Sequence, residues 1–100
     1  MIFMGTYTMP SDKTDEWVKC MADMAENQIP SCIKKWQTYT CYDEIGSKGY
    51  NLIFTEKGKV DEAVIEINKL MFPFLQIEGS TWKLEPLMRV TEAFELLKAQ

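Results

Sequence analysis

The sequence contains no histidine, and this absence removes several kinds of active site at once. A Ser-His-Asp triad or a Cys-His pair needs an imidazole as its general base, so neither can form. A haem iron ligated by histidine is excluded for the same reason. Any chemistry carried out by this chain must therefore use carboxylate, hydroxyl, phenol, amide or thiol groups.

Cysteine is also scarce, and its spacing argues against a metal centre. Cys20, Cys32 and Cys41 are far apart, with no Cys-x-x-Cys pair and no histidine to complete a zinc site. We therefore expect no metal and no cofactor. The first eight residues lack the basic start and apolar core of a signal peptide, and no apolar run approaches a membrane span of about 18 residues. Three free thiols then predict a reducing, cytoplasmic location without membrane attachment.

The chain also has few basic residues, which argues against binding to nucleic acids. The 100 residues carry 11 basic and 15 acidic side chains, a net charge of −4 that repels a phosphate backbone. We expect no nucleic-acid partner. With 46% hydrophobic residues, the chain can build one core, so residues 1–100 are predicted to form a single domain.

Hydrophobic periodicity predicts alternating strands and helices along the chain. Apolar residues recur at helical spacing in a first helix over residues 13–28 and in a second from Val60 to Pro73. A short C-terminal helix follows, with Thr91 as its N-cap and Phe94 and Leu97 facing inward. The β-branched and aromatic segments that predict strands are residues 2–9, 33–42, 50–55 and 80–88. Residues 43–49 are predicted to be a long turn.

This order predicts an α+β fold of the ferredoxin-like βαββαβ plan. Such a fold has a four-stranded antiparallel sheet with its two main helices on one face, here with a short C-terminal helix added. The strands alternate poorly between apolar and polar residues, so the second face of the sheet is semi-apolar and needs a cover.

A homodimer, with two sheets packed face to face around a cleft, would supply that cover. Between the second helix and the last strand, the sequence places large apolar residues in a surface loop, and we expect them at the dimer interface: Phe72, Phe74, Leu75 and Ile77. Alternatively, residues 72–77 fold back over the protein's own core.

Three short segments resemble a known superfamily. They are the opening Met-Ile-Phe-Met-Gly-Thr-Tyr-Thr, the Trp36 strand leading through a Gly-rich turn to Tyr50-Asn51-Leu52-Ile53, and the closing Leu84-Glu85-Pro86-Leu87 before a short helix. Together with the element order, they resemble the dimeric α/β-barrel superfamily, and within it a small bacterial and archaeal family of unknown function. The resemblance implies the fold and a dimer. It implies no single activity, because the superfamily includes monooxygenases, isomerases and ligand-sensing domains.

Aromatic and amide side chains are the best candidates for a ligand site. We expect them to line the cleft between the sheets and to accept a small planar or anionic organic molecule. The candidates are Tyr7, Trp36, Tyr39, Asn51 and Trp82. The alternative is that these aromatics only pack in the core or in the dimer seam.

Three hypotheses of function follow from these residues. The first is a small-molecule-binding or regulatory homodimer. The second is a cofactor-independent monooxygenase or isomerase that uses Asn51, Tyr7 or Glu85, provided that Glu85 is partly buried and not paired with Lys83 in solvent. The third is a dimerisation partner for another protein. An enzyme would hold a titratable group with a strongly shifted pKa in the cleft, whereas a binding protein needs none.

Overall fold

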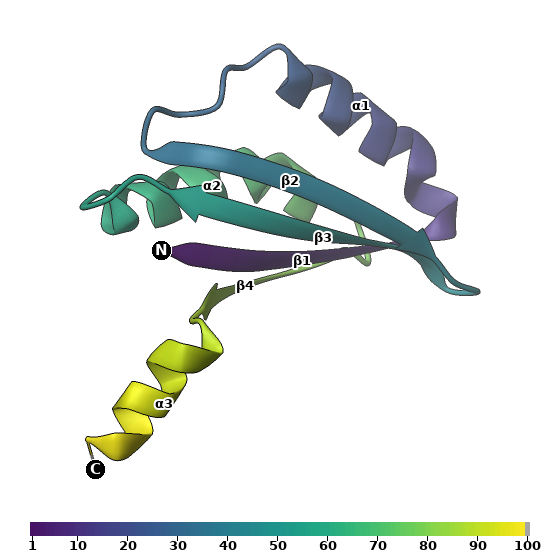
Figure 1. Cartoon of the computed structure of the whole chain (residues 1–100). Helices are drawn as coiled ribbons and strands as arrows, with labels where there is room; N and C mark the ends of the chain where they lie inside the picture. Colours follow the sequence, from purple (N-terminus) through teal and green to yellow (C-terminus); the bar gives the residue numbers. More distant parts are fainter. Residues whose placement is uncertain (100) are drawn as a thin grey trace.

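The computed structural model describes residues 1–99, and Gln100 lies outside the described residues. The chain forms four strands and three α-helices, with a short 3-10 turn at Ser11–Lys13 before the first helix (Figure 1). The elements are β1 (Ile2–Pro10), α1 (Thr14–Ala25), β2 (Ile33–Tyr42), β3 (Gly46–Thr55), α2 (Val60–Leu75), β4 (Thr81–Leu87) and α3 (Val90–Lys98).

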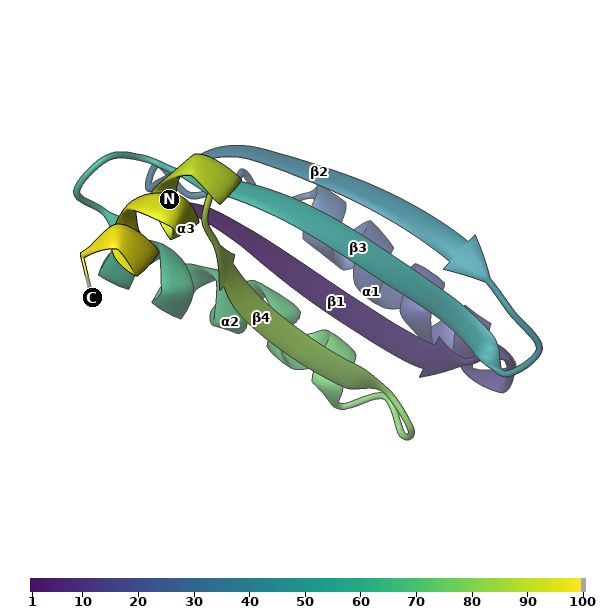
Figure 2. The same ribbon diagram turned by 60° about the horizontal axis from the view of Figure 1, so that its bottom comes forward.

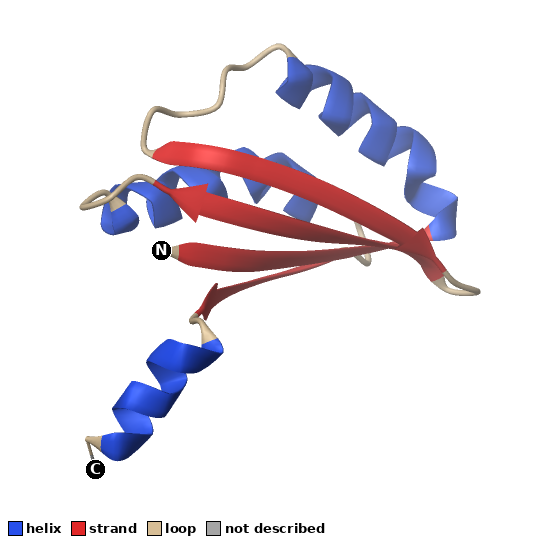
Figure 3. Cartoon of the chain, in the orientation of Figure 1, coloured by secondary structure: helices blue, strands red, loops and turns tan. Residues whose placement is uncertain are grey.

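The strands form one antiparallel sheet in the order β2-β3-β1-β4. The helices α1 and α2 both lie on one face of this sheet (Figure 3). The predicted α+β class and the four-stranded antiparallel sheet are confirmed, and the arrangement is consistent with a ferredoxin-like fold.

The core lies between the sheet and α2. Alternate residues of β1 face the helices and are buried, among them Phe3 and Tyr7, and Ile53 of β3 lies beside them with no exposed surface. The helix α2 contributes Ala63 and Ile67, which lie one turn apart on its sheet-facing side and are fully buried. Periodicity in the sequence predicted this stripe of α2 correctly.

The β2–β3 hairpin is tighter than its sequence predicts. Residues 43–49 were expected to be a loop, but β3 already begins at Gly46. The reason is Asp43, whose carboxylate Oδ1 accepts the backbone N–H groups of Ile45 and Gly46, each at 2.9 Å. These bonds close the turn within three residues, and a Cβ at Gly46 would collide with the backbone of Met9 in β1. Gly46 therefore serves strand pairing as well as the turn.

Pro73 does not end α2, and this overturns the predicted interface loop. The helix continues to Leu75 past Pro73, which lies in its last turn, so the missing N–H and the crowding of the proline ring affect only the end of the helix. Helical geometry then points Phe74 into the core, and Phe74 and Ile77 are only 2% and 4% exposed. Their assignment to a dimer interface is therefore wrong. The other two predicted interface residues, Phe72 and Leu75, are exposed, as interface residues would be in a single chain.

The C-terminal helix is exposed where the sequence predicted it to face inward. No side chain of α3 is buried, and the predicted inward-facing residues Phe94 and Leu97 are 56% and 64% exposed. Figures 1 and 2 show α3 leaving the end of β4 on the side of the sheet opposite to α1 and α2. The helix begins at Val90 with Arg89 as its N-cap in extended conformation, two residues before the predicted N-cap Thr91.

The sheet face opposite to α1 and α2, called the open face below, is semi-apolar as predicted. Its side chains form rows across the four strands, and the two rows near one end of the face are the apolar ones. One of them holds Leu52 of β3 and Met4 of β1 between Gln37 and Glu85 at the edges. The neighbouring row holds Phe54 and Ile2 between Lys35 and Leu87. The charged residues of both rows therefore lie at the edges and the apolar residues in the middle.

Candidate functional site

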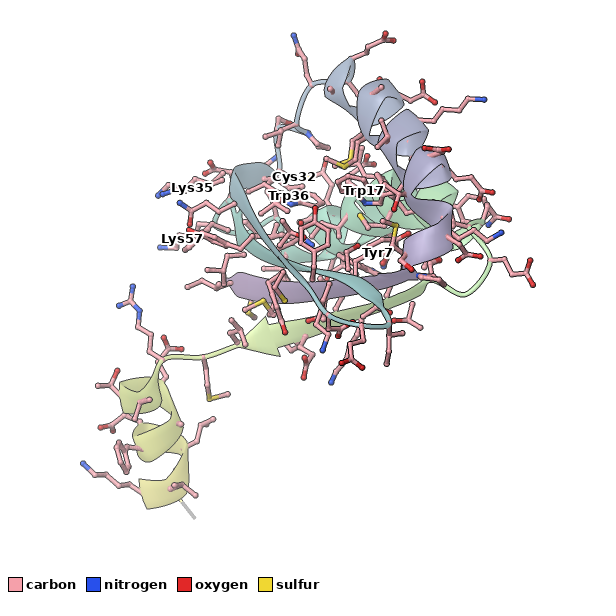
Figure 4. The ribbon with its side chains drawn as sticks, turned by 90° about the vertical axis from the view of Figure 1, so that its right-hand side faces the viewer. Tyr7, Trp17, Cys32, Lys35, Trp36 and Lys57 are labelled. Carbon is pink, nitrogen blue, oxygen red and sulfur yellow. The ribbon has the colours of Figure 1, made fainter. Side chains whose placement is uncertain are left out.

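A small pocket lies between α1 and the sheet, bordered by α2. Its volume is about 60 Å³, and a neighbouring hollow of about 250 Å³ beside β2 shares Met21, Met24, Trp36 and Thr38 with it. Figure 4 shows Trp17 of α1, Trp36 of β2 and Tyr7 of β1 converging on this region, whereas the labelled lysines point away from it. The pocket is lined by Tyr7, Trp17, Met21, Met24, Trp36, Thr38, Thr40, Ser47, Gly49, Asn51, Met71 and Phe74.

Tyr7 and Phe74 form one wall of the pocket. The Tyr7 ring meets the Phe74 ring edge-on, at 5.7 Å between centroids and 75° between planes. The Tyr7 hydroxyl donates a hydrogen bond of 3.2 Å to the Phe74 carbonyl oxygen. Burial raises the pKa of the Tyr7 phenol above its ordinary value, so the group stays protonated at neutral pH. A hydrogen bond with the Ser80 side chain lowers this pKa to a smaller extent, so protein groups hold the phenol oxygen on both sides.

Asn51 holds the sheet side of the pocket in a fixed geometry. Its Oδ1 accepts hydrogen bonds from Trp36 Nε1 at 2.9 Å and from Thr38 Oγ1 at 2.8 Å. Its Nδ2 donates to the Gly5 carbonyl oxygen at 3.1 Å, across to β1. Both lone pairs of Oδ1 and one of the two N–H groups are therefore occupied. Asn51 is 7% exposed and orients the Trp36 ring, so its main role is positioning.

The helix α1 covers the pocket without being anchored by a buried side chain of its own. Trp17, Met21 and Met24 lie one turn apart on its inner side and line the pocket, yet no residue of α1 is buried. The Cys20 thiol lies 3.8 Å from the Pro73 carbonyl oxygen of α2, which is a weak tie between the helices. Burial raises the pKa of this thiol, so Cys20 stays in its unreactive protonated form. Side chains therefore do not completely fill the space between α1 and the sheet.

The pocket is electrically neutral. Every lining residue is uncharged at neutral pH, and the polar side-chain groups are hydroxyls, one amide and two indole N–H groups. A buried ion without a counter-charge is costly, so this lining favours a neutral ligand over an anion. The anionic alternative raised by the sequence is not favoured by the structure.

Three of the five predicted ligand residues meet in this pocket. Tyr7, Trp36 and Asn51 lie together in its wall, on the sheet face that α1 and α2 cover. They therefore face the helices of their own chain and not the open face, where a cleft between two sheets would lie. Trp82 also faces the helices, but its ring covers Gly5 and its Nε1 donates to Asn68 Oδ1 at 3.3 Å. Tyr39 lies on the open face and is exposed.

The lining residues that were not predicted do carry a signal in the sequence. Trp17, Met21 and Met24 form a regular apolar stripe, and such a stripe is typical of core packing, which is how it was interpreted. Thr38 and Thr40 alternate with Tyr39 along β2, so correct strand parity alone would have placed them with Trp36.

The carboxylates singled out in the sequence lie outside the pocket. Glu85 is exposed on the open face and forms an ion pair with Lys83 at 3.4 Å, so the paired alternative is correct. Two backbone hydrogen bonds in the hairpin turn lower the pKa of Asp43, which marks a structural role. Within residues 1–99, no three His, Cys, Asp or Glu side chains are grouped so that they could share a metal ion. No helix in this range is long and apolar enough to cross a membrane.

No protein-family model, no curated protein and no solved structure matches the chain. The resemblance to the dimeric α/β-barrel superfamily therefore stays a prediction. The chemistry of the pocket must be argued from its own residues.

Proposed function

We propose that this protein binds a small, neutral and largely apolar organic molecule in the pocket beneath α1. The observation that carries the proposal is the pocket itself, a hollow with walls of tryptophan, tyrosine, phenylalanine and methionine under a helix with no buried side chain. Ligand sites are typically concave and apolar, with a few polar groups that fix the orientation of the ligand. A ligand here would fill the space beneath α1 and bury the inner side of that helix.

The hydrogen bonds around the pocket narrow the class of ligand. The Thr38 hydroxyl already donates to Asn51 Oδ1, so what it offers to a ligand is a lone pair. A ligand with one hydroxyl or N–H donor on a flat apolar body matches this arrangement. Flexible methionines adapt to such a body, and aromatic faces stack on it. The adjoining hollow extends the space toward the size of a bicyclic ring.

Binding is favoured over the rival hypothesis of a cofactor-independent monooxygenase or isomerase. Tyr7 is the titratable residue in the pocket wall, and burial shifts its pKa away from neutral pH. A general base works best with a pKa near the operating pH, so this shift runs in the wrong direction for proton abstraction. The Asn51 amide is occupied by three hydrogen bonds and serves to orient its neighbours.

Titration with two probes of the same shape tests this proposal. 2-Naphthol is neutral and has one hydroxyl donor, whereas 2-naphthoate has the same ring system and a negative charge. We expect 2-naphthol to shift the indole N–H resonances of Trp17 and Trp36, and to bind at least tenfold more tightly than 2-naphthoate. Equal or tighter binding of the anion would contradict the proposed ligand class.

A pair of variants in α1 shows whether the probe occupies this pocket. Trp17→Ala removes a lining side chain, so we expect it to weaken the binding of 2-naphthol at least fivefold. Val18→Ala is the matched control, because Val18 is the next residue, lies outside the pocket lining and is exposed. The same loss of affinity in both variants would place the probe elsewhere on the molecule.

We also propose that the protein is a homodimeric α/β barrel in which two open faces pack together. The accessible surface of the chain is 7275 Å², whereas a compact monomer of this mass exposes about 5,800 Å². The excess of roughly 1,450 Å² exceeds the ~800 Å² that each partner contributes to a standard interface. On the central strands, Ile2, Met4, Leu52 and Phe54 form an apolar patch of the open face, with Lys35 and Glu85 on the edge strands beside it, and this pattern resembles an interface core and rim.

Light scattering during gel filtration tests the dimer. At low micromolar concentration we expect a mass twice the 11.6 kDa of the chain, and a mass of one chain would contradict the proposal. Leu52→Lys puts a charge in the middle of the open face and should give monomers. Ile65→Lys is the matched control, because Ile65 is an exposed apolar residue of α2, and this variant should stay dimeric.

The location that we propose is the reducing cytoplasm. Within the described residues, Cys20, Cys32 and Cys41 are all free thiols, and Cys41 is exposed. Exposed free thiols persist in reducing compartments and are readily oxidised outside them. Fractionation of cells that express the tagged protein tests this location, and recovery from a secreted or membrane fraction would contradict it.

A further inference from the structure

The C-terminal helix α3 has an apolar side that none of the residues 1–99 covers. Val90, Phe94 and Leu97 follow the spacing i, i+4, i+7 and share one side of the helix. All three are more than half exposed, and no residue of α3 is buried. The other side carries Glu92 and Glu95. The helix is therefore amphipathic, and its apolar side is free to pack against another apolar surface.

The position of α3 points toward the open face. Figures 1 and 2 show that α3 extends away from the sheet on its open side, apart from the rest of the molecule. This projection contributes to a radius of gyration of 15.3 Å, larger than the ~13 Å of a compact chain of this length. A second layer packed on the open face would therefore lie beside α3.

The length of α3 argues that it needs this contact. A helix of nine residues is marginal in water by itself, because isolated helices shorter than about 12 residues rarely repay the cost of nucleation. Packed sheets lie about 10 Å apart, and nine helical residues span about 14 Å. The helix is thus long enough to reach past a second sheet laid on the open face, and it would gain its stability there.

We propose that α3 is an exchanged arm, which packs its Val90, Phe94 and Leu97 side against a second copy of this chain. This inference rests on the face-to-face dimer proposed above and assigns a role to a segment outside the sheets. By symmetry, the second copy returns the same contact. Each chain would then be held by the open face and by two helices, one from each copy.

The charges of α3 favour a second copy over a membrane surface. Helices that lie on anionic membranes carry lysine and arginine on their polar side. The polar side of α3 carries Glu92 and Glu95, with Lys98 paired to Glu95 at 3.7 Å. A negative helix is repelled by anionic lipid, whereas a protein surface can accept its apolar side.

Serine substitutions on two sides of the same helix test the proposal. The double variant Phe94→Ser, Leu97→Ser removes the apolar side of α3, and we expect its dimer dissociation constant to rise at least a hundredfold. Leu96→Ser is the matched control. Leu96 is exposed to the same extent as Phe94, 56%, but lies on the side of Glu92. We expect its dissociation constant to stay within threefold of the wild-type value, as measured by analytical ultracentrifugation.

Hydrogen exchange of the α3 amides supplies a second readout, which reports on the helix itself instead of on the dissociation constant. In the wild-type dimer, the amides of α3 should be protected, and in the double variant they should exchange at the rate of an unfolded segment. The strands should stay protected in both proteins, since no residue of α3 is buried against them in its own chain. Protection of the strands also shows that the variant is folded.

The outcomes separate the two proposals. A wild-type dimer with a double variant of unchanged dissociation constant would overturn the exchanged arm and leave the face-to-face dimer intact. Unprotected α3 amides in the wild-type dimer would overturn the arm as well. A wild-type monomer at all concentrations would overturn both. Equal weakening by Leu96→Ser and the double variant would show that the apolar side of α3 has no special role, which also contradicts the proposal.

Discussion

Replacing Asn51 with aspartate tests the hydrogen-bond geometry that shapes the pocket. Asparagine and aspartate have nearly the same shape, so Asn51→Asp changes hydrogen bonding and charge with little change in packing. The oxygen that accepts from Trp36 Nε1 and Thr38 Oγ1 is retained. The donor to the Gly5 carbonyl oxygen, at 3.1 Å, is replaced by a second oxygen. The ionised carboxylate of this variant would therefore place a negative oxygen against a carbonyl.

The magnitudes of these effects predict a clear loss of stability at neutral pH. Desolvating a carboxylate at a site that is 7% exposed costs several kcal/mol. The two donors to Oδ1 become charge-assisted and offset about 2 kcal/mol of this cost. The lost bond to Gly5 O adds about 1 kcal/mol. The net loss in the free energy of unfolding is about 3 kcal/mol, a large share of the stability of a small domain.

Lowering the pH should restore most of the stability that Asn51→Asp loses at neutral pH. Burial and the Gly5 carbonyl raise the pKa of the new carboxyl in the folded state above its value in the unfolded chain. The penalty is then complete above the folded pKa and shrinks as the pH falls through it toward the unfolded value near 3.9. Once protonated, the new carboxyl group can donate to Gly5 O as the amide of Asn51 does.

Urea unfolding followed by tryptophan fluorescence measures this effect between pH 8 and pH 4, at low micromolar concentration because the pI is about 4.8. The quantity of interest is the difference between variant and wild type at each pH, which cancels the titration of the other carboxylates. A difference that does not change with pH would refute the geometry assigned to Asn51. Thr38→Val is a milder companion that removes one donor to Oδ1 without adding a charge, and its penalty should be independent of pH.

Two further substitutions test the packing and the titration of the β1 strand. Gly5→Ala should destabilise the protein by about 1–3 kcal/mol, since a Cβ at this position would lie 2.9 Å from Cζ3 and 3.0 Å from Cζ2 of the Trp82 ring. Thermal unfolding measures this loss, and an unchanged melting temperature would contradict the close packing of Trp82 on Gly5. Tyr7→Phe should cost about 1 kcal/mol at pH 7, because it removes one donor to a Phe74 carbonyl that Ser80 Oγ also approaches at 2.9 Å. Because burial raises the pKa of Tyr7 in the folded state, the unfolded wild-type chain ionises at Tyr7 first as the pH rises above the ordinary phenol pKa of 10.0. The stability of the wild type therefore falls faster with pH than that of Tyr7→Phe. The difference in unfolding free energy between the two proteins should narrow in alkaline urea titrations.

The order of the elements could be predicted from the sequence because each helix and strand has a local signal. The stripe from Ala63 to Met71 repeats every three to four residues, and the strand 33–42 is rich in β-branched and aromatic residues. The segment boundaries were harder. The end of α2 depends on whether Phe74 has a core to enter, and the start of β3 depends on pairing with β1. Neither condition is local to the residues concerned.

The face of each side chain was harder to predict than the strands themselves. Hydrophobic alternation decides which side of a strand is buried, and here both sides carry large residues. In β3, Asn51 and Ile53 face the helices while Leu52 and Phe54 face outward, with similar apolar content on both sides. Tyr7, Trp36 and Asn51 were identified as ligand candidates by residue type. Their common pocket inside one chain became visible only through the register of the sheet.

The unfilled pocket beneath α1 and the uncovered open face have a common physical origin. A chain of 100 residues has one sheet with two semi-apolar faces, and its own helices cover only one of them. The covering is partial on the inner face, where α1 leaves the pocket, and absent on the open face, where α3 extends without a partner.

Because residues alternate along a strand, β3 presents Asn51 to the proposed ligand and Leu52 to the proposed second copy. The two proposed binding events therefore meet within one peptide unit of the same strand. A ligand that tightens the hydrogen bonds of Asn51 would also hold Leu52 in place, and β3 is thus the shortest path by which occupancy of the pocket and dimerisation could influence each other.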